Sequence, residues 1–123
     1  MRYEVSYSDN LPEWVGGNCS YPWYPMFGTC KITIRPKYKD DLGILNHEIC
    51  HAKQYGRKFF HGLMTKFSGK YRYECELEAY TEQIKAYNYT SIDQAMWIVD
   101  ALCNKYNLKI SRDDALKRVA ALI

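Results

Sequence analysis

The stretch His47-Glu48-Ile49-Cys50-His51 decides how this chain of 123 residues folds around a site. On a helix, residues four apart differ by about 40° in azimuth and about 6 Å in rise, so His47 and His51 can reach one metal ion together. Glu48 lies about 100° further round the helix, off the metal axis but close enough to contact a water molecule at the ion. A zinc ion with three protein ligands and one open position activates water near neutral pH. The stretch therefore predicts a zinc site and calls for a third ligand.

The third ligand is expected on a later helix, because no further histidine follows at a suitable spacing. Position 57, six residues after His51, is an arginine, and His61 is the only other histidine in the chain. Residues 71–89 start with a long segment that lacks Gly and Pro and is rich in helix formers, which predicts a helix. Three acids lie two positions apart in it: Glu74, Glu76 and Glu78. They cannot all share one helical face, so they compete for the role.

Over roughly residues 29–87, the chain resembles the gluzincin metallopeptidases, especially the minimal single-domain ones. In that family the second helix carries the third ligand as the first Glu of a pattern such as E-x-E-A-D, and this chain reads Glu76-Leu77-Glu78-Ala79-Tyr80. The resemblance implies one zinc ion held by His47, His51 and Glu76, with Glu48 as the general base of peptide hydrolysis. It also implies that Tyr80, in place of the usual Asp, orients a ligand imidazole through its hydroxyl.

Two further roles follow from the same resemblance. Family members stabilise the developing oxyanion with a His or Tyr, and the sequence leaves four candidates open: Tyr55, His61, Tyr80 and Tyr87. The family also binds the substrate backbone along the free edge of a strand before the first zinc helix. We therefore expect a peptide or protein substrate to contact Ile32, Thr33 and Ile34, with the aromatic segment 14–27 near one end of the cleft.

Residue patterns predict a small α+β zincin-like domain, with a short N-terminal sheet or hairpin followed by about four helices. Alternation of polar and apolar residues predicts strands at 2–7 and 29–35, and Pro, Gly and aromatic residues predict a structured loop or irregular hairpin at 11–28. Residues 57–70 are interpreted as a loop. The helices are expected at 41–55, 71–89, 92–106 and 112–121, with the last two backing the zinc helices.

Composition restricts the protein class. A chain of this length fits one domain, residues 1–123, and its net charge of +3 without a dense Lys/Arg run argues against nucleic acid as a partner. No apolar run approaches the length of a membrane span and the N-terminus lacks a signal-peptide pattern, so we expect a cytoplasmic protein without a membrane partner. Five cysteines form no disulfide framework, although Cys19 and Cys30 could pair under oxidising conditions. The oligomeric state stays open.

Two other functions compete with a peptidase. A non-catalytic module would use zinc to brace two helices and its aromatic loop to bind a partner. Small proteins of this type are frequent in phage genomes, so the resemblance extends to a virion-associated role. A zinc amidase acting on cell-wall peptides is a third interpretation. Glu48 favours an enzyme, because a structural zinc site needs no base, and an open fourth coordination position would favour it further.

Overall fold

A computed structural model describes residues 2–22, 28–58 and 60–123 of the chain. Within these residues, a sheet of three strands precedes five α-helices, which confirms the expected α+β class and adds one helix to it. The elements are β1 (Arg2–Tyr7), β2 (Gly17–Ser20), β3 (Thr29–Ile34), the 3-10 turn η1 (Pro36–Tyr38), α1 (Leu42–Arg57), α2 (His61–Phe67), α3 (Gly69–Tyr87), the 3-10 turn η2 (Ile92–Ala95), α4 (Met96–Asn104) and α5 (Arg112–Ala120).

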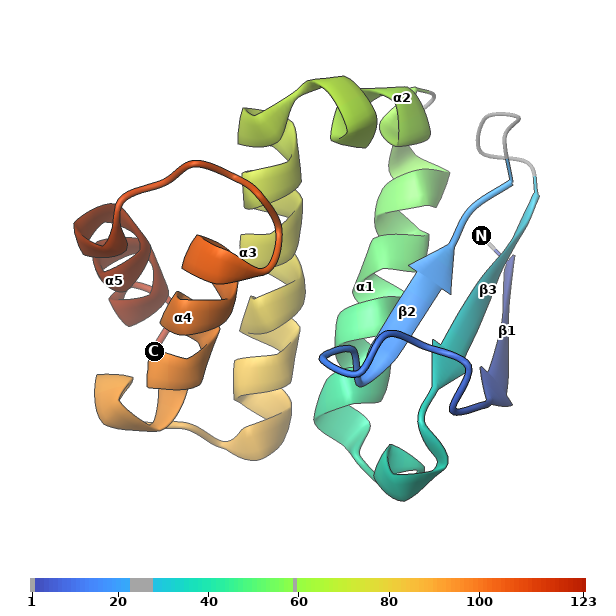
Figure 1. Cartoon of the computed structure of the whole chain (residues 1–123), viewed down its shortest axis with the longest axis horizontal. Helices are drawn as coiled ribbons and strands as arrows, with labels where there is room; N and C mark the ends of the chain where they lie inside the picture. The colour runs from blue at the N-terminus through green and yellow to red at the C-terminus, as the bar shows by residue number, and fades with distance from the viewer. Residues whose placement is uncertain (1, 23–27, 59) are drawn as a thin grey trace.

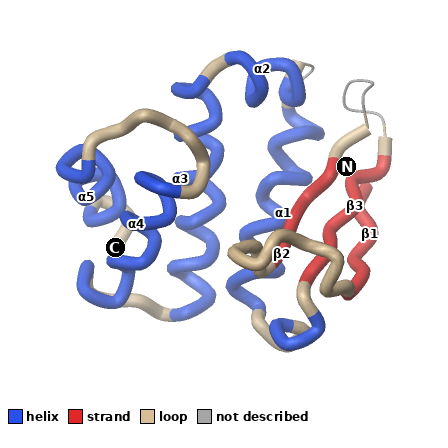
Figure 2. The backbone as a smooth tube through the Cα atoms, viewed as in Figure 1, coloured by secondary structure: helices blue, strands red, loops and turns tan. Residues whose placement is uncertain are grey.

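Helix α1 lies between the sheet and α3, and α4 and α5 pack on the far side of α3 (Figure 1). Helices α1 and α3 run antiparallel, and α2 crosses the end where α1 stops and α3 starts (Figure 2). The two helices predicted to carry the zinc ligands are therefore neighbours along their length. No helix among the described residues is both long enough and apolar enough to cross a membrane.

Strand β3 is the centre of the sheet, whose order is β1-β3-β2. It pairs in parallel with β1 and antiparallel with β2, so both of its edges are used. The prediction that Ile32, Thr33 and Ile34 offer a free edge to a substrate is therefore wrong. Alternation correctly indicated one buried face, since Ile32 and Ile34 are almost fully buried. It could not reveal the edges, because these depend on pairing with strands elsewhere in the chain.

The helix boundaries follow from local capping. The Asp41 side chain accepts a hydrogen bond from the Ile44 amide at 3.0 Å and starts α1. Ser68 caps α3 in the same way, and Asn88, with a φ of 57°, ends α3 in the left-handed conformation. The interpretation of residues 57–70 as a loop is wrong, because α2 occupies residues 61–67 and α3 already begins at Gly69.

The main core lies between α3, α4 and α5, and it confirms that the last two helices back a predicted zinc helix. The third predicted helix, at 92–106, is divided into η2 and α4, and the fourth, at 112–121, corresponds to α5. Burial of Ile98, Val99 and Leu102 against α3 fixes that helix from behind. This support leaves the opposite face of α3 to meet α1.

We expect Gly43→Ala to destabilise the fold, because α1 and Tyr87 of α3 touch at this glycine. A Cβ atom on Gly43 would lie 2.3 Å from the Tyr87 ring. The ring cannot easily withdraw, since its hydroxyl donates to the Asp41 carboxylate at 2.7 Å. Overpacking of this kind costs about 1–3 kcal/mol, measurable as a lower midpoint in urea unfolding.

The matched control is Gly62→Ala in α2, where an added Cβ meets no atom within 4 Å. Replacing an exposed helical glycine by alanine stabilises a helix by about 0.5–1 kcal/mol. The two variants should therefore shift the midpoint in opposite directions. Equal shifts would show that Gly43 is not a close contact between the helices.

Candidate metal centre

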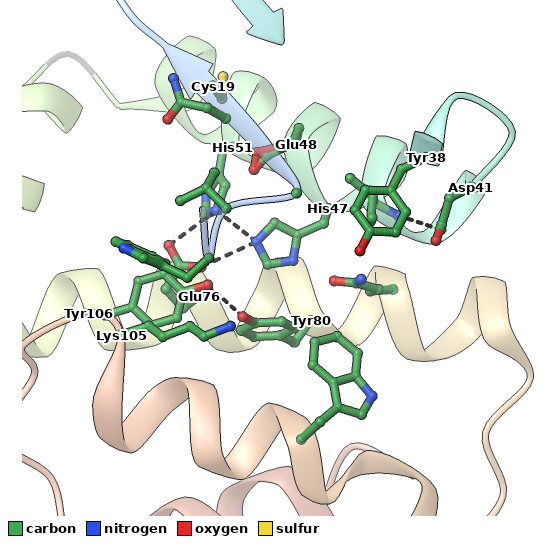
Figure 3. A pocket seen from close by; sticks show the side chains of 18 of the residues that line it. Cys19, Tyr38, Asp41, His47, Glu48, His51, Glu76, Tyr80, Lys105 and Tyr106 are labelled. Atoms are coloured by element: carbon green, nitrogen blue, oxygen red, sulfur yellow. Dashed lines mark hydrogen bonds and ion pairs between the residues drawn. The ribbon is translucent and has the colours of Figure 1, made fainter. Parts of the chain in front are cut away.

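Three predicted ligands converge between α1 and α3. The Nε2 atoms of His47 and His51 lie 3.2 Å apart, and the Glu76 carboxylate oxygens lie 3.2 Å from His47 Nε2 and 3.1 Å from His51 Nε2. All three side chains are buried, and Figure 3 shows them pointing toward one another from the two helices. The other two acids point elsewhere: Glu74 pairs with Arg118 and Glu78 with Arg57. Glu76 is thus the acid that joins the two histidines, as predicted.

The spacing of these atoms fits a zinc ion. Ligands placed tetrahedrally about 2.05 Å from zinc are about 3.3 Å apart, close to the separations between His47, His51 and Glu76. Without a cation, a buried carboxylate facing two imidazole nitrogens needs a proton as counter-charge. Accordingly, although burial alone would lower the pKa of His51, the Glu76 carboxylate raises it to about 9. The two nitrogens and one oxygen are also a donor set that zinc commonly takes.

The protonation of His51 is set by Gln54, a residue that the sequence interpretation missed. Gln54 Nε2 donates to the Cys75 carbonyl at 2.9 Å and to a Glu78 carboxylate oxygen at 2.8 Å, so the amide oxygen must face His51. It accepts from His51 Nδ1 at 2.8 Å. In the neutral imidazole, this bond places the proton on Nδ1 and leaves the Nε2 lone pair free for a metal.

Glu78 therefore supports the centre from outside it. Its carboxylate accepts two hydrogen bonds from Arg57, at 3.1 and 2.5 Å, as well as the one from Gln54. Side-chain hydrogen bonds from Arg57 lower the pKa of Glu78, which keeps the carboxylate charged. A chain of hydrogen bonds thus runs from Arg57 through Glu78 and Gln54 to His51.

Tyr80 contacts His47 in a different way from the one expected. Its ring meets the imidazole edge to face, with ring centres 4.5 Å apart, and its hydroxyl bonds the Tyr106 hydroxyl at 2.5 Å. His47 Nδ1 is buried without a hydrogen-bond partner among the described residues. Orientation of a ligand imidazole by the Tyr80 hydroxyl is therefore not what the structure shows; the aromatic ring packs against His47 instead.

Glu48 is buried beside the ligands and is not one of them. One of its carboxylate oxygens has no hydrogen-bond partner among the described residues, and burial raises the pKa of the group. Strand β2 passes next to it at Gly17, where a Cβ atom would lie 2.9 Å from Ile44 and 3.3 Å from Glu48 Cγ. The glycine allows the edge strand to approach α1 at the position of this carboxylate.

A cavity of about 530 Å³ opens onto the centre. It is lined on one side by residues of the 14–21 segment, which includes β2, and on the other by α3, by Trp97 of α4 and by Lys105 and Tyr106. Arg35 holds the start of that segment by donating to the backbone carbonyls of Leu11, Pro12 and Val15. Trp14 and Tyr21 line the cavity, which agrees with the predicted aromatic end of the cleft, while residues 23–27 fall outside the described part of the chain.

The other candidate oxyanion donors differ in their access to this cavity. Tyr87 lines it, but its hydroxyl donates to Asp41. Tyr55 and His61 do not line it: the Tyr55 hydroxyl accepts from the Gly28 amide, and His61 is buried against Tyr21 and Tyr71. Burial lowers the pKa of His61 to about 4, so it is neutral at physiological pH.

Two cavity residues come from a part of the chain where no functional residue was predicted. Lys105 and Tyr106 follow α4 and reach the same side of the centre as Glu76 and Tyr80 (Figure 3). Burial raises the pKa of both Tyr80 and Tyr106, so the two hydroxyls keep their protons. In a hydrogen-bonded pair of hydroxyls, one proton is used within the pair and the other is available to a ligand.

Comparisons with protein-family models, with curated proteins and with solved structures gave no significant match. The function of the protein is therefore inferred from the geometry of the centre itself.

We expect Gln54→Met to weaken zinc binding by roughly 10–100-fold, the usual cost of losing a group that orients a ligand. Methionine keeps the volume but lacks the amide oxygen that accepts the hydrogen bond from His51 Nδ1. The affinity can be measured by competition with a chromophoric chelator. Gln83→Met is the matched control, because Gln83 is also buried and lines the cavity but bonds Tyr87. Equal losses in the two variants would remove the orienting role of Gln54.

Proposed function

We propose that the protein is a zinc-dependent peptidase. The observation that carries this proposal is a group of three buried ligands, His47, His51 and Glu76, which no fourth His, Cys, Asp or Glu joins among the described residues. Three protein ligands and an open position are typical of catalytic zinc, whereas structural zinc is usually closed by four. The buried Glu48 carboxylate beside the group, one oxygen of which has no hydrogen-bond partner in the described part of the chain, suits a general base.

A zinc ion held by this group supplies Lewis-acid activation of a water molecule and of the substrate carbonyl. Glu48 accepts a proton from the attacking water and passes it to the leaving amine. Its burial supports this role, because a carboxylate whose pKa is raised takes and returns a proton more readily near neutral pH. Gln54 holds His51 in the tautomer that leaves its Nε2 free.

Strand β2 replaces β3 as the proposed binding site for the substrate backbone. It is at the edge of the sheet and lines the cavity through Gly17, Asn18 and Cys19. An extended peptide added to this edge gains backbone hydrogen bonds and passes beside Glu48. The Tyr80–Tyr106 pair lines the cavity from the α3 and α4 side, where its free O–H can donate a hydrogen bond to the developing oxyanion.

A cleavage screen tests this function. The purified protein, loaded with zinc, is incubated with a library of proteome-derived peptides, and new termini are identified by mass spectrometry. We expect cleavage that stops on treatment with phenanthroline and returns when zinc is restored. If zinc-loaded protein produces no more termini than chelated protein, the centre is not a peptidase site and a non-catalytic zinc module becomes the better interpretation.

A further inference from the structure

Helix α2 turns an apolar face to solvent. The Leu63 side chain is 56% exposed and that of Phe67 is 75% exposed, and Phe60 at the start of the helix is 59% exposed. The spacing of positions 60, 63 and 67 puts them on one side of a helix. Together they expose on the order of a few hundred Å² of apolar surface, which in a folded protein usually marks an interaction site.

The Leu63 and Phe67 side chains are not what holds α2 in place. His61 is the buried residue of the helix, and its Nδ1 bonds the Tyr71 hydroxyl at 2.7 Å. The Thr65 carbonyl accepts from Arg72 at 2.8 Å. These contacts with α3 are therefore made from the inner side of α2, while Leu63 and Phe67 on the outer side stay exposed to solvent.

The surroundings of this face are strongly basic. Residues 49–73 contain six Lys or Arg and no Asp or Glu. The net charge of this segment is therefore twice the net charge of +3 that the whole chain carries. Lys58, Lys66 and Lys70 are exposed and have no acidic partner among the described residues. The ammonium group of Lys66 lies over the Phe67 ring at 5.8 Å, so a cationic and an apolar group share this surface. Lys58 lies over the ring of Tyr71, the α3 residue that contacts His61, at 5.1 Å.

We propose that this basic apolar face, made of Phe60, Leu63 and Phe67 with Lys58, Lys66 and Lys70, binds the surface of an anionic lipid bilayer. Apolar side chains on one side of a short helix, flanked by lysines, are the pattern of a helix that lies in the membrane interface. Helix α2, which joins α1 to α3 and carries Leu63, Lys66 and Phe67, lies at one end of the molecule (Figures 1 and 2).

A bilayer fits these observations better than the other occupants. An acidic protein would match the charge but would also need a groove to receive a protruding helix. A nucleic acid would match the charge of the lysines but would leave the apolar Leu63 side chain exposed to solvent. The expectation of no membrane partner was based on the lack of a spanning segment, and a segment that lies on the surface is not detected by that criterion.

Cosedimentation with lipid vesicles tests the proposal. We expect the zinc-loaded protein to bind vesicles of phosphatidylcholine and phosphatidylserine, to bind phosphatidylcholine alone weakly, and to be released by salt. The Leu63→Ser/Phe67→Ser variant should lose at least about tenfold in partitioning, because each buried side chain contributes a transfer free energy of that order. Replacing Lys58, Lys66 and Lys70 by Gln should cost about fivefold for each lysine.

Leu42→Ser is the matched control, since Leu42 is 66% exposed at the start of α1, away from α2. It should bind vesicles like the wild type, and all variants should keep their melting temperature and zinc content. The proposal is overturned if the wild type does not bind anionic vesicles, or if Leu63→Ser/Phe67→Ser binds as well as Leu42→Ser. It is also overturned if the variant abolishes only a concentration-dependent dimer, since the face would then bind a second copy of the chain.

Discussion

We expect Glu48→Gln to lower peptide turnover by roughly 10²–10⁴ while leaving zinc bound, which is the usual cost of removing a general base. Glutamine matches the shape of glutamate but cannot take a proton from the attacking water. Zinc content should stay at one per chain, because Glu48 does not belong to the group of His47, His51 and Glu76. Turnover can be followed with the best peptide from the cleavage screen.

Stability distinguishes a catalytic from a structural role for Glu48. One of its oxygens is buried without a hydrogen-bond partner in residues 2–22, 28–58 and 60–123, so removing the charge should not lower the melting temperature. Glu74→Gln is the control: that carboxylate pairs with Arg118 at the surface, and its loss should leave turnover unchanged. A Glu48→Gln enzyme with wild-type turnover would rule out the base role, whatever its zinc content.

The metal centre could be predicted from sequence because two of its three ligands are separated by one turn of the same helix. The spacing of His47 and His51 is set by one helix, and the match to a second motif then selected Glu76 from three acids. Gln54 was also within reach of such reasoning, since it lies three residues after His51 on the same helix and shares its face. Tyr106 was not, because it meets Tyr80 only through the packing of α4 on α3.

The sheet and α2 show where local patterns stop being informative. Strand β2 contains Gly17, Asn18, Cys19 and Ser20, residues of low or middling strand propensity, and it forms because β3 provides a partner. Helix α2 has seven residues, too few to be stable alone, and it is fixed by the contact of His61 with Tyr71. Both elements depend on contacts with residues outside the element itself, and β2 supplies the wall of the cavity beside Glu48.

The second large effect is expected for Glu76→Ala, which should abolish stoichiometric zinc binding. This carboxylate contacts both histidines, and two neutral imidazoles alone make a weak site. The loss of affinity should exceed the roughly 10–100-fold that accompanies loss of an outer group such as Gln54. Zinc stabilises any protein whose folded state alone binds it, so added zinc should raise the melting temperature of the wild type but not of this variant.

Substitutions of the two neighbouring acids, Glu74 and Glu78, test which residue of α3 faces the histidines of α1. Glu74→Ala should bind zinc like the wild type, because Glu74 faces Arg118. Glu78→Ala should keep one zinc per chain with an intermediate loss of affinity, since it removes a partner of Gln54 but no ligand. The order of effects, largest for position 76, then 78, then 74, follows from the three directions in which these side chains point. If Glu78→Ala released the zinc and Glu76→Ala retained it, α3 would be displaced by two residues against α1, and Glu78 rather than Glu76 would complete the group with His47 and His51.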